Sequence, residues 1–215
     1  MSGHGHVGDV APAGFWEERY AGEERVWSGN VNRTTADVAI GLEPGRSLDL
    51  GCGEGGDVLW FAHAGWQAMG VDISPTAVRR ANEEAARVGR ADRARCVAAD
   101  LATWTTEERF DLVTASFFQS PVALDRSAIL RRAAGQVERG GHLLVVSHAA
   151  YPSWVPAEDR HAEHQFLTPG QEVAALGLVE EGWSVVLAET RSRDVTAPDG
   201  SPAVLDDAVV LLRRD

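Results

Sequence analysis

The feature that most constrains this chain is a glycine-rich turn that directly follows a short apolar run, in the stretch "SLDLGCGEGG" from Ser47 to Gly56. Gly51, Gly53 and Gly56 have the spacing G-x-G-x-x-G. Glycines at this spacing allow a tight turn between a buried strand and a helix, and they let a ligand approach the bare backbone. The stretch therefore predicts a strand, a turn and a helix that form a ligand site, but the spacing alone does not select the ligand.

Short apolar runs alternate with helical segments from this turn onward. Such alternation is typical of βαβ units and predicts an α/β fold, a Rossmann-like doubly wound sheet with seven strands. The expected strands are Ser47–Leu50, Ala68–Val71, Ala94–Ala98, Phe110–Ala115 and Leu143–Ser147, and the expected helices are Gly56–Ala64, Pro75–Val88 and Asp125–Glu138. Two further strands, Trp183–Asp194 and Ala203–Arg213, flank the turn "APDG", so the mostly parallel sheet is expected to end in an antiparallel hairpin.

A single domain is expected, because 215 residues suffice for one sizeable core and no interdomain linker is visible. We expect a disordered tail over residues 1–13 and one domain over 14–215. Two short helices in residues 14–45, the second capped by Asn32, are expected to form an N-terminal lid. Residues 148–167 are expected to form an insertion that contacts the substrate.

Composition narrows the range of partners. Lys and Arg number 20 against 32 Asp and Glu, a net charge of −12, and such a surface repels nucleic acid and anionic lipid. There is no apolar run of about 20 residues and no signal-peptide pattern at the N-terminus. Cys52 and Cys96 lie in expected core elements, which is typical of a reducing compartment. We therefore expect a cytoplasmic protein with no nucleic-acid or membrane partner, and the oligomeric state stays open.

Histidines and acids cluster in two places without indicating a metal site. His4 and His6 lie in the glycine-rich tail, and "AEDRHAEH" at 157–164 contains His161 and His164. Neither stretch is supported by a cysteine or a known ligand spacing. No metal is expected.

The charge of the glycine turn helps to separate the candidate ligands. A dinucleotide brings a pyrophosphate of about −2, which favours helix N–H groups without nearby carboxylates, yet Asp49 and Glu54 flank this turn. S-adenosylmethionine carries an ammonium and a sulfonium and no phosphate, so a carboxylate attracts it. Asp72 ends the next strand, where it suits the ribose of either cofactor. Asp100 ends the third strand, where it suits an adenine amino group.

Four short motifs carry a family resemblance. The stretches "LDLGCGEG", "GVDIS", "AADL" and "FDLVTAS" occur in order and resemble the cofactor motifs of class I S-adenosylmethionine-dependent methyltransferases, over roughly Phe15 to Ser147. "FWEERY" and "VWSG" near the N-terminus resemble the small-molecule branch that includes thiopurine and tellurite-resistance methyltransferases. The resemblance implies an enzyme that transfers a methyl group from S-adenosyl-L-methionine to a small acceptor.

The resemblance also implies a set of cofactor-binding residues. It assigns Asp49, Gly51, Cys52, Gly53 and Gly55 to the methionine moiety, Asp72 and Ile73 to ribose and adenine, Asp100 and Leu101 to the adenine edge, and Ser116 and Phe117 to the region of the methyl group. Trp16, Tyr20 and Trp27 are expected either to cover the methionine end, where aromatic faces favour a sulfonium, or only to dock the N-terminal helix. The stretch "SFFQ" at 116–119 departs from the polar-Pro-Pro-aromatic motif of many amine methyltransferases, which speaks against a DNA base or a glutamine amide as acceptor.

The acceptor site is expected beside these residues. Its candidate lining residues are Phe118, Gln119, Tyr151, Trp154 and Phe166, whose aromatic side chains indicate an apolar pocket. His148 follows the fifth strand and is the candidate general base, with an ordinary loop histidine as the alternative. Two other functions stay open at this point, an NAD-dependent oxidoreductase and a non-catalytic cofactor-binding module.

Overall fold

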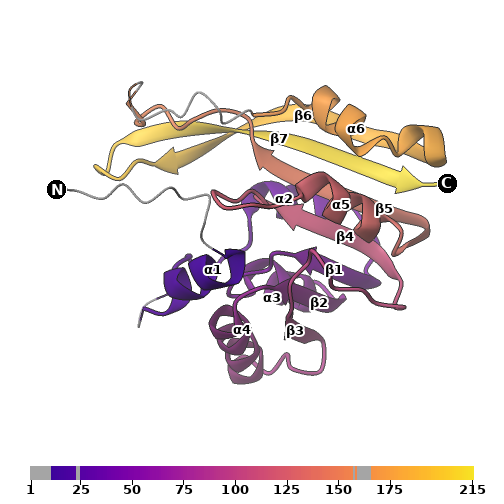
Figure 1. Cartoon of the computed structure of the whole chain (residues 1–215), viewed down its shortest axis with the longest axis horizontal. Helices are drawn as coiled ribbons and strands as arrows, with labels where there is room; N and C mark the ends of the chain where they lie inside the picture. The colour runs from indigo at the N-terminus through magenta and orange to yellow at the C-terminus, as the bar shows by residue number, and fades with distance from the viewer. Residues whose placement is uncertain (1–10, 23–24, 157, 159–165) are drawn as a thin grey trace.

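The computed structural model describes residues 11–22, 25–156, 158 and 166–215 and contains a seven-stranded sheet of order β3-β2-β1-β4-β5-β7-β6. Figure 1 shows the long β6–β7 hairpin at one edge of the sheet and β3 with α4 at the other. All strand pairs from β3 to β5 are parallel, whereas β7 runs antiparallel to both β5 and β6. The expected mostly parallel sheet with a C-terminal antiparallel hairpin is therefore confirmed.

Six of the seven strands lie close to their expected bounds, whereas β5 begins at Val137 and not at the expected Leu143. They are β1 Arg46–Leu50, β2 Gln67–Asp72, β3 Ala94–Ala98, β4 Phe110–Ser116, β5 Val137–His148, β6 Trp183–Thr196 and β7 Pro202–Arg214. The central strands are almost continuously buried, as is usual for parallel strands that helices cover on both faces.

Most of the helices begin directly after a capping residue that the sequence offers. They are α1 Pro12–Tyr20, α2 Arg33–Ala39, α3 Gly56–His63, α4 Pro75–Arg87, α5 Arg126–Ala134 and α6 Pro169–Leu176, followed by a 3-10 turn Val179–Glu181. Asn32, Ser74, Asp125 and Thr168 each accept a hydrogen bond from a backbone N–H of the first turn. Such caps stabilise a helix by about 1 kcal/mol each and fix where it starts.

Two expected boundaries were wrong. The helix expected to reach Glu138 ends at Ala134, because Val137 instead pairs with Phe110 and starts β5, where its side chain is fully buried. The pairing between these distant strands outweighs the local sequence pattern, which favours a helix. The helix α1 begins at Pro12, within the stretch expected to be a disordered tail, because proline is favourable in the first turn of a helix.

Two apolar clusters cover the two faces of the sheet. One joins Leu48 and Leu50 of β1 to α5 and α6, and the other joins Leu112 and Leu144 to α2, α3 and α4. Because side chains alternate along a strand, neighbouring residues of one strand serve opposite layers. The sheet is thereby held between helices on both faces.

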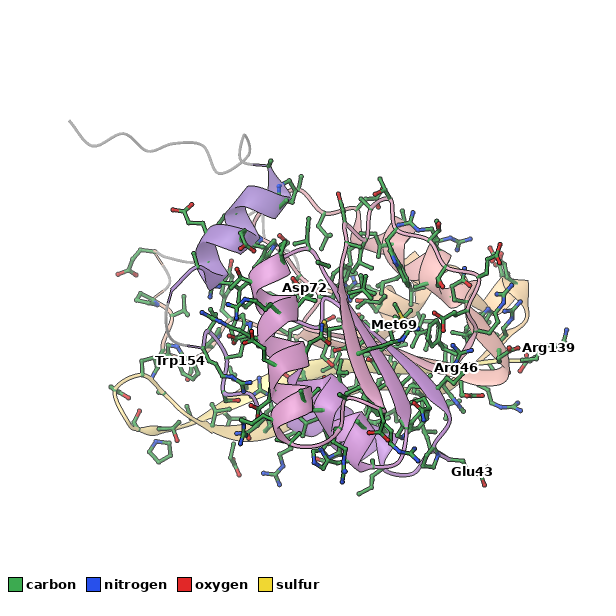
Figure 2. The ribbon with its side chains drawn as sticks, turned by 90° about the horizontal axis from the view of Figure 1, so that it is seen from below. Glu43, Arg46, Met69, Asp72, Arg139 and Trp154 are labelled. Carbon is green, nitrogen blue, oxygen red and sulfur yellow. The ribbon has the colours of Figure 1, made fainter. Side chains whose placement is uncertain are left out.

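The carboxyl ends of the parallel strands meet at one edge of the sheet, where ligands of open α/β sheets bind. Asp72 is the last residue of β2, whereas Arg46 is the first residue of the neighbouring β1. Figure 2 shows these two labelled residues at different ends of the strands, with Trp154 far from Arg46. Asp72, which the sequence analysis assigned to the cofactor site, therefore lies at the carboxyl edge of the sheet.

Candidate functional site

The turn after β1 has the backbone geometry that its glycines predict. Gly51, Gly53 and Gly55 all have positive φ, at 70°, 51° and 80°. L-residues rarely adopt this conformation, which costs a residue with a Cβ about 1–2 kcal/mol. The amides of Gly51 and Cys52 both donate to the Val71 carbonyl, at 2.8 and 3.1 Å, so the turn is tied to β2.

Asp72 connects this turn to the next one. Its Oδ2 accepts from the Gly53 amide at 2.9 Å, and its Oδ1 accepts from the Ser74 amide at 2.9 Å. The carboxylate is buried, and desolvation raises its pKa although these backbone donors oppose the shift. Asp72 is the last residue of β2, and the neighbouring Ile73 is half-buried.

Two further carboxyl groups, those of Asp49 and Asp57, are buried near the glycine turn. Asp49 accepts from Thr114 Oγ1 at 2.8 Å. Asp57, in the first turn of α3, accepts from the Asn32 amide and from Ser116 Oγ, each at 2.7 Å. Asp57 was missed by the sequence reasoning, although an acid directly after the glycine turn was a visible signal.

These acids share one electrostatic property. Burial raises the pKa of Asp49 well above its ordinary value, with the charge of Asp57 as the next cause, and burial also raises the pKa of Asp57. Among the described residues, no Lys, Arg or His forms an ion pair with Asp49, Asp57 or Asp72. Buried carboxylates without a counterion favour a bound cation.

Glu54 does not add to this negative region, contrary to the sequence argument. Its buried carboxylate pairs with Arg80 Nη1 at 2.9 Å and accepts from the amides of Val26 and Trp27 at 3.0 and 3.2 Å. The Arg80 charge compensates that of Glu54. Glu54 therefore holds the N-terminal segment in place instead of repelling or attracting a ligand.

The N-terminal aromatic residues lie over the glycine turn. Tyr20 is buried, its hydroxyl accepts from Trp27 Nε1 at 2.8 Å, and a Cβ placed on Gly53 would lie 2.9 Å from that oxygen. Trp16 lies next to Tyr20, with ring centroids 6.4 Å apart. Glu17 fixes α1 to the start of α4 by accepting from the Thr76 amide at 3.2 Å and from the Ser74 hydroxyl at 2.5 Å. The structure thus brings the three expected aromatic residues together above the turn.

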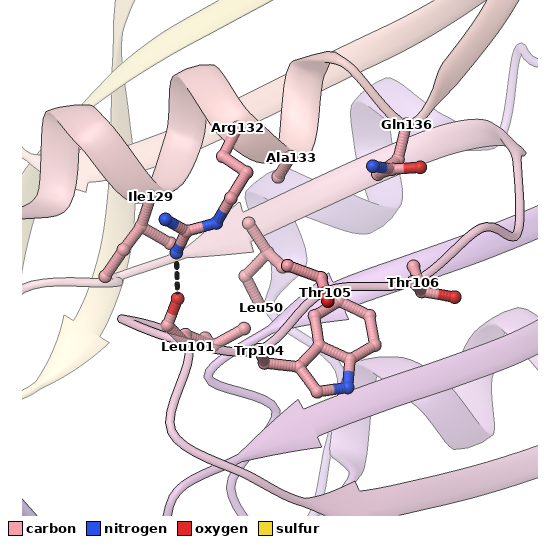
Figure 3. A pocket seen from close by; sticks show the side chains of 9 residues that line it. All are labelled: Leu50, Leu101, Trp104, Thr105, Thr106, Ile129, Arg132, Ala133 and Gln136. Carbon is pink, nitrogen blue, oxygen red and sulfur yellow. Dashed lines mark hydrogen bonds between the residues drawn. The ribbon is translucent and has the colours of Figure 1, made fainter.

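The residues expected at the adenine edge are only partly available. Asp100 is exposed and its Oδ1 accepts from the Ala102 amide at 2.8 Å, which stabilises the turn after β3. Leu101 is buried against the core, and its carbonyl accepts from the Arg132 guanidinium. Figure 3 shows Leu101 in a pocket between α5 and the loop after β3. The pocket is lined by Leu50, Leu101, Trp104, Thr105, Thr106, Ile129, Arg132, Ala133 and Gln136.

The residues after β4 link the glycine turn to the end of β5. A Cβ on Gly51 would lie 2.7 Å from the Phe118 ring, so this ring covers the turn directly. Phe117 has φ of 51°, unusual for a bulky residue, and its ring stacks on His148 with centroids 4.2 Å apart. Gln119 accepts from the His148 amide at 3.2 Å. The expected residues Phe117, Phe118, Gln119 and His148 therefore form one contiguous group.

Arg126 at the start of α5 holds this group and was missed by the sequence reasoning. Its Nε donates to the Phe118 carbonyl at 2.9 Å, its Nη1 to Glu172 at 2.6 Å and its Nη2 to Ser147 Oγ at 2.8 Å. Glu172 and Ser147 are both buried. An arginine in a helical pattern gives no signal of such a role, because its partners come from α6 and β5.

The insertion after β5 contributes aromatic residues. Tyr151 and Phe166 meet edge to face with centroids 4.8 Å apart, and Trp154 is half-buried. His161 and His164, considered above as metal ligands, lie outside the described residues. The described part of the chain has no cluster of three or more potential metal ligands. None of its helices combines the length and the apolar character that crossing a membrane requires.

Comparisons with known proteins find similarity to methyltransferases. Residues 48–141 match the family model of a methyltransferase domain. The chain is 31% identical over 106 residues to "Probable thiol methyltransferase 2" of Arabidopsis thaliana, which covers 47% of this chain and 46% of that protein. The chain spans less than half the length of the curated relatives it matches.

Two solved structures share the fold. TehB from Haemophilus influenzae superposes with a TM-score of 0.66 at 17% identity, over 94% of this chain and 66% of that one. The glycopeptide N-methyltransferase MtfA in complex with S-adenosyl-L-methionine superposes with a TM-score of 0.61 at 17% identity, over 90% of this chain and 98% of that one. Residues 48–141 are therefore similar to a methyltransferase domain, and the whole chain shares the fold of TehB and MtfA.

Proposed function

We propose that this protein is an S-adenosyl-L-methionine-dependent methyltransferase that acts on a small-molecule acceptor. The observation that carries the proposal is the group of buried carboxylates Asp49, Asp57 and Asp72 around the glycine turn, for which the described residues supply no counterion. A cationic ligand would offset the free-energy cost of these charges, whereas a pyrophosphate would increase it. The methyltransferase match over residues 48–141 supports the same cofactor.

The residues fit the cofactor in the following way. Asp72 would accept hydrogen bonds from the ribose hydroxyls. Asp49 and Asp57 would attract the cationic methionine end of the cofactor. The backbone amides of the glycine turn would contact the ligand directly, because glycine has no side chain. Trp16, Tyr20 and Trp27 would cover this end. When bound, the cofactor supplies a methyl group on a sulfonium that already reacts readily with nucleophiles.

The protein itself would contribute mainly by holding the acceptor. Positioning a nucleophile in line at near-attack distance is worth effective molarities on the order of 10⁵ M or more. Phe118 and Gln119 after β4, together with the aromatic insertion, would line the acceptor pocket. His148 would take the acceptor's proton where the acceptor carries one.

An NAD-dependent oxidoreductase is the first rival function. Titration calorimetry with S-adenosylmethionine and with NAD(H) separates the two, because the uncompensated carboxylates should bind the sulfonium compound and reject the diphosphate. Tight binding of NAD(H) without binding of the sulfonium compound would overturn the proposal.

A non-catalytic cofactor-binding module is the second rival. A transfer screen with labelled methyl groups over thiols, phenols, amines and inorganic chalcogen anions tests it. We expect transfer to at least one class, and binding of the cofactor without any transfer would favour the module.

The acceptor assignment has its own test. Trp154 is half-buried and belongs to the insertion, not to the glycine turn. We expect Trp154→Ala to raise the acceptor KM while cofactor affinity stays nearly constant. Equal losses of both would contradict an acceptor role for the insertion.

The remaining proposals concern the setting of this activity. We propose one domain over residues 14–215, a cytoplasmic location and no nucleic-acid partner. The net charge of −12 supports the last point, since it disfavours phosphate backbones. Cys52 and Cys96 are free and buried, which supports a reducing compartment.

A further inference from the structure

The edge strand β6 has a neighbouring strand on one side only. Within the described part of the chain it pairs with β7 and with no other strand, and Figure 1 shows the β6–β7 hairpin at the edge of the sheet. Val185 and Val186 of β6 are 45% and 53% exposed. A long edge strand offers unpaired backbone groups to any other strand, so proteins usually shorten, charge, bulge or cover such an edge.

One hydrogen bond at the end of the hairpin shows which residues of β6 direct their backbone groups outward. The Ala197 amide donates to the Ser201 carbonyl at 2.8 Å, in a pair that continues the β6–β7 ladder. The register of this ladder is regular from Leu187 to Thr196. Because hydrogen-bonded and non-hydrogen-bonded pairs alternate in an antiparallel ladder, the odd-numbered residues from 189 to 195 bond to β7. The even-numbered residues from 188 to 196 therefore direct their N–H and C=O groups away from the sheet.

Two charged side chains on β6 are complementary to a second copy of the same strand. Glu189 and Arg191 lie on one face and form an ion pair, with Arg191 Nε 2.5 Å from Glu189 Oε1. An antiparallel pairing of two copies centred on Thr190 places Glu189 of each copy opposite Arg191 of the other. The same pairing joins the outward backbone groups of Thr190 to those of its counterpart, and those of Ala188 to those of Ser192. Glu189 and Arg191 then occupy non-hydrogen-bonded pairs, in which opposite side chains are closest.

Other registers of this pairing bring like charges together. A shift in one direction places Glu189 opposite its own counterpart, and a shift in the other direction places Arg191 opposite its counterpart. Like charges directly opposite each other destabilise a sheet, whereas opposite charges contribute about 0.2–1 kcal/mol per pair. Arg193, which follows on the same face, is already paired with Asp207 of its own chain. Charge therefore favours the register centred on Thr190.

We propose that two copies of this protein pair antiparallel through β6, centred on Thr190, and form a dimer with one continuous sheet. A self-complementary edge of this kind has twofold symmetry, so the contact closes after two copies and does not grow into a fibre. The exposed Val185 and Val186 lie beside the bulge between Val185 and Leu187, where the regular ladder ends. The end of the second strand would remove part of their apolar surface from water. The proposal uses no residue of the cofactor or acceptor site and is independent of the proposed function.

The first test is the molar mass of the full chain, measured by sedimentation equilibrium at physiological ionic strength. We expect a monomer–dimer equilibrium, and a monomer at every accessible concentration would overturn the proposal. Glu189→Arg places four arginines side by side across the contact, and Arg191→Glu places four glutamates there. Each variant should weaken dimerisation by about tenfold or more. The matched control is Glu83→Arg, in an exposed ion pair with Arg79 on α4, which should leave dimerisation unchanged.

The double variant Glu189→Arg with Arg191→Glu tests the register. It restores alternating charges in the pairing centred on Thr190, so dimerisation should return to within a few-fold of the unsubstituted chain. Single variants that dimerise as well as the unsubstituted chain, or a double variant that stays as weak as the single ones, would show that this pairing is wrong. Thermal unfolding checks that all variants keep the fold, as expected for two side chains at the surface.

Amide hydrogen exchange of the unsubstituted chain tests the pairing without any substitution. We expect the protection of the Thr190 amide to rise with protein concentration, because this amide bonds only to the second copy. The Arg191 amide should stay protected at all concentrations, because it bonds to β7. Exchange at Thr190 that does not depend on concentration would refute a contact through β6. All these readouts come from the free protein, so their failure is distinct from failure of cofactor binding or methyl transfer.

Discussion

The two halves of the site differ in how their charges are balanced. Around the glycine turn, buried carboxylates such as Asp49 and Asp72 have backbone or hydroxyl donors and no counterion among the described residues. On the proposed acceptor side, the group formed by 116–119 and His148 is framed by the ion pairs Arg126–Glu172 and Arg193–Asp207, whose carboxylates are buried. The carboxylates of the first half thus lack counterions among the described residues, whereas these charged side chains of the second half are paired.

The comparison teaches that binding and positioning rely on different electrostatics. Uncompensated charges raise the free energy of the unliganded site and increase the gain on binding a ligand of opposite charge. Compensated buried pairs add little net stability, but breaking one leaves a costly buried charge. Changes on the acceptor side should therefore appear mainly in stability, and changes at the glycine turn mainly in cofactor affinity.

The largest expected effect is on the acceptor side. Arg126→Ala removes three hydrogen bonds and leaves the buried Glu172 without its counterion, so we expect a loss of about 3–5 kcal/mol in the free energy of unfolding. Denaturant titration measures it. Arg79→Ala breaks an exposed pair with Glu83 and should cost under about 1 kcal/mol. Equal losses would contradict the special status of the buried pair.

Asp72→Ala should have the next largest effect, on cofactor affinity. The substitution removes a charged acceptor for the ribose and frees the amides of Gly53 and Ser74. We expect S-adenosylmethionine to bind on the order of 100-fold more weakly in calorimetry. Asp92→Ala, at the opposite end of the strands, is the matched control and should change the affinity little. An unchanged affinity of the Asp72→Ala variant would contradict the view that this half of the site binds the cofactor.

A substitution in the turn separates backbone strain from the aromatic cover. Gly53→Ala imposes positive φ and places a methyl group 2.9 Å from the Tyr20 hydroxyl, whereas Gly89→Ala imposes positive φ in open space. Both should lose about 1–2 kcal/mol of stability in thermal unfolding. Gly53→Ala should additionally weaken cofactor binding by displacing Tyr20. Equal binding by both variants would show that Tyr20 does not cover the site.

The smallest expected effect is a proton released on cofactor binding. The pKa values of Asp49, Asp57 and Asp72 are raised by burial in the free protein, and a bound cation lowers them again. The complex therefore holds fewer protons, and affinity falls as the pH drops through these raised values. Calorimetry at mildly acidic pH in two buffers of different ionisation enthalpy should detect a release of up to about one proton. Proton uptake would contradict the assignment.

The order of elements was largely predictable because it depends on local signals. Each of these signals can be recognised within a few residues of sequence. They are the apolar runs of β1 to β4, the caps Ser74 and Thr168, and the glycines with positive φ. The start of β5 at Val137 could not be predicted from the sequence, because it depends on pairing with Phe110, which lies far away in the chain.

The same division applies to the candidate site. Asp49 and Asp72 follow apolar runs in the sequence, so their position at the carboxyl edge of the sheet was foreseeable. Glu54 was misjudged because its partner Arg80 lies 26 positions away on α4. Arg126 and Asp207 were missed because their partners belong to other elements.

The sequence by itself determined a mostly parallel α/β fold with an acidic, glycine-rich turn at the end of its first strand. It could do so because hydrophobic periodicity, capping residues and glycine conformation act over only a few neighbouring residues. Only the tertiary structure decided which acids keep an uncompensated charge and which are neutralised. That outcome depends on distances between side chains of separate elements, because electrostatic interactions in a protein interior are set by burial and by the nearest counterion.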